Sequence, residues 1–126
     1  MSLNNNSIVY TKAKEFSINM INLCRYIRIN RREYSLADQL LRASTSIGAN
    51  IAEASQAQSK KDFIAKMYIA MKEAGESSYW LEVLHDANII TSQQYEFHDK
   101  ACDELLRILT SILKTTKQNL ENTSPQ

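Results

Sequence analysis

Glycine and proline are almost absent from this chain, and their scarcity constrains its fold more than any other feature of the sequence. The 126 residues include two glycines, Gly48 and Gly75, and one proline, Pro125. At usual frequencies a chain of this length would carry about nine glycines and about six prolines. Because β-sandwiches, barrels and phosphate-binding α/β folds need these residues at many turns, the sequence favours an all-α protein with short loops.

Length and composition are those of one soluble domain spanning residues 1–126, with 44% hydrophobic and 23% charged residues. No apolar stretch is long enough to cross a membrane, and the first residues lack the basic and apolar regions of a secretory signal. Cys24 and Cys102 lie in apolar stretches, so we expect free, buried thiols. These features predict a cytoplasmic protein without a membrane partner.

Apolar residues at alternating spacings of three and four predict four helices, over about 7–31, 35–56, 59–87 and 91–119. Ser35, Ser59 and Thr91 are the predicted N-caps of the last three helices. Because the connections are only a few residues long, sequential helices are expected to be antiparallel neighbours. The predicted architecture is an antiparallel up-down-up-down four-helix bundle.

The helix predicted over 59–87 is apolar on nearly every side, which favours burial against another subunit. Its flanks beside the core seam include Ile64, Tyr68, Ile69, Met71 and Trp80, and we predict that these residues form an oligomer interface. The alternative is a monomer with scattered exposed apolar residues, which is common.

Both glycines fall inside predicted helices, among small residues. A glycine in a helix costs up to about 1 kcal/mol relative to alanine, so Gly48 and Gly75 suggest close packing between helix backbones. Ordinary tolerated glycines are the alternative interpretation.

Charge is unevenly distributed although the net charge is only +1. Residues 1–52 carry seven Lys or Arg and three Asp or Glu, whereas residues 53–126 carry eight and eleven. Arg25, Arg28, Arg31 and Arg32 cluster at the end of the first predicted helix, and we predict that they contact nucleic-acid phosphates. The alternative is that they complement the negative end of the helix dipole.

Catalytic chemistry has little support in the sequence. The chain contains neither Gly-x-x-x-x-Gly-Lys nor Gly-x-Gly-x-x-Gly, the strings that bind phosphate, and it has no Cys-x-x-Cys pair. A di-iron bundle needs two Glu-x-x-His strings, and only Glu82 to His85 provides one. His98 falls on the last helix's core seam, where a hydroxyl or carboxylate is expected to satisfy it. We therefore predict no enzyme activity, no cofactor and no metal, with a metal-dependent bundle enzyme as the minor alternative.

Arg42, Glu73 and Glu76 lie beside the apolar seams of neighbouring helices, and an ion pair between Arg42 and a glutamate is predicted to join those helices. Glu53 is another candidate partner for Arg42. A catalytic pair of carboxylates is the alternative interpretation, although no accompanying acid, metal or pocket signal is found.

The middle of the chain resembles a known family. The string LADQLLRASTSIGANIAEA over residues 36–54 and SKKDFIAKM over 59–67, followed by IAMKEA, ES and YWL over 69–81, are similar to the four-helix-bundle proteins related to the 23S rRNA intervening-sequence protein. The similarity extends over about residues 8–115. One departure is Glu53-Ala54, where the family usually has Glu-Gly.

The resemblance implies an antiparallel four-helix bundle that often assembles as a ring-like homopentamer. Some bacterial members are encoded inside rRNA intervening sequences, and a basic pentameric relative is the accessory protein of diversity-generating retroelements. No catalytic residues carry over to this chain. The expected function is therefore that of a non-enzymatic bacterial accessory or scaffolding protein with RNA or a nucleic-acid-processing protein as partner. A protein-interaction module without nucleic-acid contact is the alternative, because this chain is nearly neutral.

Overall fold

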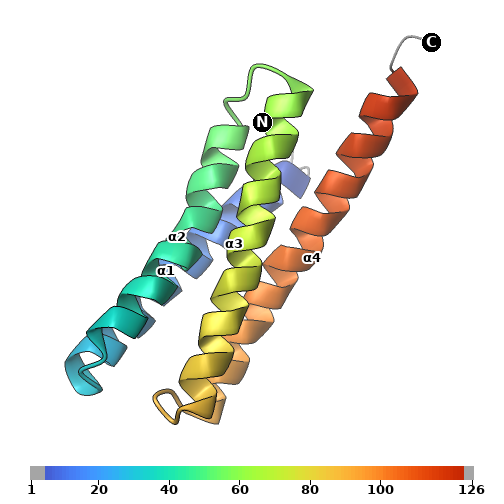
Figure 1. The fold of residues 1–126 in the computed structure, drawn as a ribbon. Coiled ribbons are helices and arrows are strands. Elements are labelled where there is room, and N and C mark those ends of the chain that lie inside the picture. The colour runs from blue at the N-terminus through green and yellow to red at the C-terminus, as the bar shows by residue number, and fades with distance from the viewer. Residues whose placement is uncertain (1–4, 124–126) are drawn as a thin grey trace.

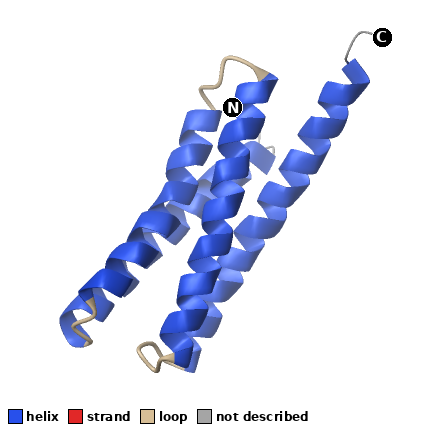
Figure 2. Cartoon of the chain, viewed as in Figure 1, coloured by secondary structure: helices blue, strands red, loops and turns tan. Residues whose placement is uncertain are grey.

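The computed structural model describes residues 5–123 and contains four α-helices without a strand in that range (Figures 1 and 2). The helices are α1 (Asn5–Asn30), α2 (Tyr34–Ala54), α3 (Lys60–Asp86) and α4 (Ser92–Thr123). The all-α prediction is confirmed, and the boundaries agree within a few residues. The last helix runs four residues further than predicted, and Pro125 lies outside the described residues.

The helices pack as a bundle in which each contacts the next along the chain and α1 also contacts α4. In Figure 1 the connection from α2 to α3 lies at one end of the bundle, and the other two connections lie at the opposite end. A hydrogen bond from Arg31 Nη1 to the carbonyl of Ile89, at 3.3 Å, joins those two connections. The C-terminal ends of α1 and α3 therefore lie at the same end of the molecule.

The core is a continuous apolar cluster supplied by all four helices. Its largest fully buried side chains include Phe16, Met20, Leu40, Met67 and Leu109. Ser44 and Ser77 are the buried polar side chains in the described range, and each donates to a backbone carbonyl of its own helix. The predicted seams are thus the core-facing stripes of the helices, as their spacing requires.

Two of the three predicted N-caps are confirmed. Ser59 Oγ accepts from the amide of Asp62 at 3.0 Å. Thr91 and Gln94 form a reciprocal capping box, with the Gln94 amide donating to Thr91 Oγ1 and the Thr91 amide donating to Gln94 Oε1. These side chains satisfy amides that the first helical turn leaves unpaired.

The Ser35 cap is wrong, because α2 begins at Tyr34 and its N-cap is Glu33, which makes no side-chain cap hydrogen bond. The chain reverses by a tight αL turn at the end of α1: Arg32 has φ 55°, and the Glu33 amide donates to the Ile27 carbonyl at 3.2 Å. Asn88, with φ 62°, occupies the equivalent position after α3. Both turns use residues other than glycine at a left-handed position, which explains how the chain turns with so few glycines.

The prediction of close packing is wrong for Gly75 and differs in detail for Gly48. A Cβ at Gly75 would have no neighbour within 4 Å, so this glycine lies on an open face of α3. A Cβ at Gly48 would lie 3.4 Å from Ser17 Oγ, so Gly48 faces α1 rather than the small residues of α3. Packing inside the chain therefore gives no reason for a glycine at position 75.

Candidate functional site

The predicted arginine cluster divides into two groups once its contacts are considered. Arg28 Nη1 lies 2.6 Å from Asp38 Oδ1, and its guanidinium lies 5.4 Å from the centre of the Tyr34 ring. Arg31 donates to the Ile89 carbonyl. These two side chains hold α1 to the beginning of α2 and to the α3–α4 connection, so part of the cluster is structural.

The other two arginines of the cluster are exposed and have few partners within the chain. Within residues 5–123, Arg25 forms one side-chain hydrogen bond, to Asn22 Oδ1 at 3.4 Å. Arg32 has no side-chain partner among the described residues, and its backbone is in the left-handed region. Because that conformation is costly for a residue with a side chain, an exposed arginine there is a candidate for a functional contact.

Arg42 of α2 forms an ion pair with glutamates of α3, where the sequence predicts one. Its Nη2 lies 2.5 Å from Glu76 Oε2, and its Nη1 lies 3.8 Å from Glu73 Oε2. The indole N–H of Trp80 donates to the same Glu76 oxygen at 3.0 Å. Glu53 instead pairs with Lys66 at 3.3 Å. The Arg42 cluster thus joins α2 to α3 through Glu76.

The five residues predicted as an oligomer interface do not share one open face. Ile64, Met71 and Trp80 are half-buried and pack against the core of their own chain, whereas Tyr68 and Ile69 are 46% and 39% exposed. The reason is that α3 contacts both α2 and α4, which cover its two flanks. Most of the apolar side chains around α3 therefore pack against other helices of the same chain.

Exposed apolar side chains nevertheless occur on all four helices, and α1 and α3 carry most of them. On α1, Ile18 is 51% exposed and Ile29 is 74% exposed. Tyr79 of α3 is 59% exposed, and Tyr68 lies on the same outer side of that helix by helical spacing. By helical spacing Ile18 and Ile29 lie opposite the core seam of α1, whereas the position of Tyr79 two residues before the core residue Leu81 did not reveal its exposure.

Glu82 and His85 do not form part of a larger ligand group. His85 Nε2 lies 2.9 Å from Ser92 Oγ, its Nδ1 lies 3.3 Å from Asp86, and its ring stacks on Tyr95. Across residues 5–123, no three His, Cys, Asp or Glu side chains are grouped closely enough to hold a metal ion. The geometry therefore adds nothing to the Glu-x-x-His string.

His98 and the two cysteines are partly or fully enclosed by the bundle. The Nδ1 atom of His98 is buried without a hydrogen-bond partner, so the expected hydroxyl or carboxylate partner is wrong for that atom. Burial also lowers the pKa of His98 from its ordinary value of 6.5. Burial raises the pKa of Cys24 and Cys102 to about 12, which keeps both thiols protonated and unreactive at neutral pH.

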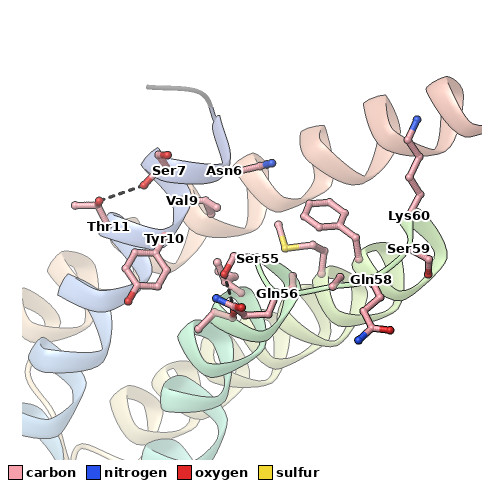
Figure 3. A pocket seen from close by; sticks show the side chains of 16 residues that line it. Asn6, Ser7, Val9, Tyr10, Thr11, Ser55, Gln56, Gln58, Ser59 and Lys60 are labelled. Carbon is pink, nitrogen blue, oxygen red and sulfur yellow. Dashed lines mark hydrogen bonds between the residues drawn. The ribbon is translucent and has the colours of Figure 1, made fainter. Parts of the chain in front are cut away.

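A cavity of about 1030 Å³ opens at the end of the bundle beside the α2–α3 connection (Figure 3). Val9, Ile51 and Met67 contribute apolar lining, and Asn6 and Gln56 are among its polar residues. Lys60 is its only charged lining residue in the described part of the chain. Tyr10 and Lys60 are the titratable side chains among its described lining residues, which include no carboxylate or histidine. The sequence pattern did not reveal this cavity.

Comparison with known proteins gives a consistent result. A sequence model of the 23S rRNA-intervening sequence protein family matches residues 5–111. A crystal structure of a protein of unknown function from the S23 ribosomal protein family of Bacteroides thetaiotaomicron is 43% identical to this chain. The similarity covers 88% of this chain and 99% of that one, with a TM-score of 0.87. No curated protein matches.

Between residues 5 and 123, none of the helices combines the length and the hydropathy that a membrane span requires. The family match covers all of α1, α2 and α3 and most of α4, including the arginine cluster and the Arg42 cluster. The solved relative extends the agreement from sequence to the arrangement of the helices. The chain belongs to the 23S rRNA-intervening sequence protein family.

Proposed function

We propose that this protein is a non-enzymatic, cytoplasmic scaffolding or accessory protein that assembles as a homopentamer and contacts nucleic acid through one end of the bundle. The proposed subunit is an antiparallel up-down-up-down bundle, supported by the short connections at alternating ends in Figure 1. The number of subunits follows from the resemblance to ring-forming relatives.

The observation that carries the nucleic-acid part is Arg32. Its side chain is exposed, has no partner among the described residues and stands at a left-handed turn position that glycine would occupy without strain. Arg31 lies beside it, and assembly would repeat these cations on each subunit. Repetition supports binding to a polyanion by a chain whose own net charge is only +1.

Titration of a fluorescently labelled RNA with the protein at several salt concentrations tests this proposal. We expect affinity to fall as salt rises, because phosphate contacts release counterions. Replacing Arg32 with alanine should weaken binding and lower the slope of log affinity against log salt by about one, because one phosphate is no longer neutralised. Lys114→Ala, a surface change near the other end of α4, is the matched charge control and should bind as the wild type does.

A protein-interaction module without nucleic-acid contact is the competing function. It is favoured by the intramolecular partners of Arg28 and Arg31, which engage two of the four clustered arginines. Absence of RNA binding at low salt by an assembled wild-type protein would support this second function. Equal binding by the Arg32 variant and the Lys114 variant would show that the arginine end is not the contact surface.

A further inference from the structure

The outer face of α1 combines exposed isoleucines with cations that have few partners in their own chain. Ile18, Ile21 and Arg25 follow helical spacing on this face, and Ile18 is 51% exposed. In the part of the chain that the structure describes, the only side-chain hydrogen bond of Arg25 is the long one to Asn22. An apolar stripe bordered by free cations is suited to a partner surface that is apolar and acidic.

The outer face of α3 has the complementary character. Tyr79 is 59% exposed, and Gly75 lies one turn before it with open space where a Cβ would be. Glu82 follows on the same side of the helix by spacing, and it is exposed and forms no hydrogen bond or ion pair with another described residue. The surrounding segment 73–104 contains eight Asp or Glu and one Lys.

Gly75 adds an observation independent of charge. A glycine in the middle of a helix is less favourable than alanine, and no neighbour inside this chain requires it. Because glycine has no side chain, the surface at Gly75 beside the exposed Tyr79 allows another helix to approach closely. An occupant outside the chain would therefore explain this glycine.

The two faces also match in height along the bundle. Both α1 and α3 end near the Arg31–Ile89 hydrogen bond, at the same end of the molecule. At a rise of 1.5 Å per residue, Arg25 lies about 8 Å from the C-terminal end of α1. Glu82 lies about 6 Å from the C-terminal end of α3. Ile21 lies about 14 Å from its helix end, between Tyr79 at about 11 Å and Gly75 at about 17 Å.

We infer that the outer face of α1 of one copy packs against the outer face of α3 of a second copy, with Arg25 facing Glu82 and the isoleucines packing on Tyr79 and Gly75. This inference deepens the proposed function, because it assumes that the protein is a homo-oligomer. The contact joins two different faces, so it is head-to-tail and can close into a ring. Matching heights bring the arginine end of every copy to the same side of the assembly.

Charge reversal in the full-length protein tests the pairing, with mass measured by light scattering on a sizing column. Arg25→Glu and Glu82→Arg should each weaken assembly by roughly tenfold or more, since each places like charges opposite one another. The double variant, with both reversals in one chain, should recover assembly because the charges are again complementary. Lys114→Glu has the same charge change as Arg25→Glu and should leave the mass unchanged.

Two further variants test the apolar part and the register. Gly75→Gln should reduce assembly while circular dichroism remains helical, because its side chain would occupy the contact. Lys72, one turn before Gly75, would lie near Lys14 of the other copy, so Lys72→Glu should strengthen assembly. No change in mass with either variant would contradict this placement.

The outcomes separate this interface from the proposed function. A wild-type protein that remains monomeric at low salt contradicts both the homo-oligomer and the interface. An oligomer that tolerates both single reversals contradicts only the interface. If Arg25→Glu lowers RNA affinity without changing the mass, the α1 face contacts nucleic acid and the inference is wrong. Recovery by the double variant supports the inference specifically, since that chain no longer has the cation on α1.

Discussion

At the scale of single residues, Arg32 and His98 are in environments that carry a cost, and neither cost is visible from residue type alone. Arg32 has a left-handed backbone conformation at the end of α1. His98 has a buried nitrogen without a partner. Each of these positions is unfavourable for folding and yet holds an arginine or a histidine. Substitutions there can therefore show whether the side chain contributes to stability or to function.

Replacing Arg32 with glycine should stabilise the fold. Glycine adopts φ 55° without the steric penalty of a side chain, which is about 1–2 kcal/mol for an ordinary residue, and part of that gain is offset by greater freedom when unfolded. Urea unfolding should show an increase in stability of about 0.5–1 kcal/mol. Asn88→Gly should gain less, because asparagine already tolerates this conformation. A loss of stability in Arg32→Gly would indicate that the arginine side chain makes an important contact.

His98 should make stability depend on pH. Burial lowers its folded-state pKa below the ordinary 6.5, so the unfolded chain binds this proton more readily than the folded chain. Stability is therefore retained above about pH 6.5 and decreases as the pH falls from there toward the folded-state pKa. Urea unfolding at pH 7.5 and 5.5 should show a smaller decrease for His98→Gln than for the wild type. Equal decreases would assign the pH dependence to other groups.

At the scale of helices, α3 contributes both to packing inside the bundle and to the exposed surface of the molecule. Its flanks pack against α2 and α4, and its outer side bears Tyr68, Gly75 and Tyr79. Hydrophobic periodicity predicted the existence of the helix and its core stripe, but it assigned half-buried residues such as Trp80 to an oligomer interface. Which flank is covered depends on where the neighbouring helices lie, and periodicity within one helix does not contain that information.

Replacing Gly75 with alanine should stabilise the isolated subunit. A methyl group there would meet nothing within 4 Å, so only the helix propensity changes, by about 0.8–1 kcal/mol. Chemical unfolding at high salt, where electrostatic association is screened, should show that gain. Gly48→Ala should gain less, because its Cβ would lie 3.4 Å from Ser17 Oγ. A destabilised Gly75→Ala chain would mean that the outer face of α3 is tightly packed even under these conditions.

At the scale of the whole molecule, the distribution of charge matters more than its total. The chain is almost neutral, yet residues 1–52 carry seven Lys or Arg against three Asp or Glu, whereas residues 73–104 carry eight Asp or Glu and one Lys. A molecule with two unlike sides can associate with copies of itself more strongly at low salt than at high salt. Such salt dependence distinguishes electrostatic association from purely apolar association.

The melting temperature of the wild-type protein should rise with protein concentration at low ionic strength and lose most of that dependence in high salt. The physical reason is that association stabilises the folded chain by mass action, whereas salt screens the exposed charges that drive it. Differential scanning calorimetry over a range of about a hundredfold in concentration would measure this effect. A melting temperature that is constant at every concentration and salt condition would contradict folding-linked assembly.

The sequence by itself determined the helices and much of their ends. Four apolar stripes with helical spacing could be satisfied only by helices that bury them together, and the Thr91–Gln94 capping box depends on neighbours three residues apart. Family membership was also accessible, because α2 and α3 carry a dense and specific pattern.

The tertiary structure decided what those local patterns could not. The turn at Arg32 replaced the expected Ser35 cap because the hydrogen bond from Glu33 to Ile27 closes the end of α1. Trp80 became a partner of Glu76, Gly75 was left on an open face, and Arg25 was separated from the arginines that hold the bundle together. Each outcome depends on which side chains from distant parts of the chain come into contact, and only the packing of helices against one another establishes those contacts.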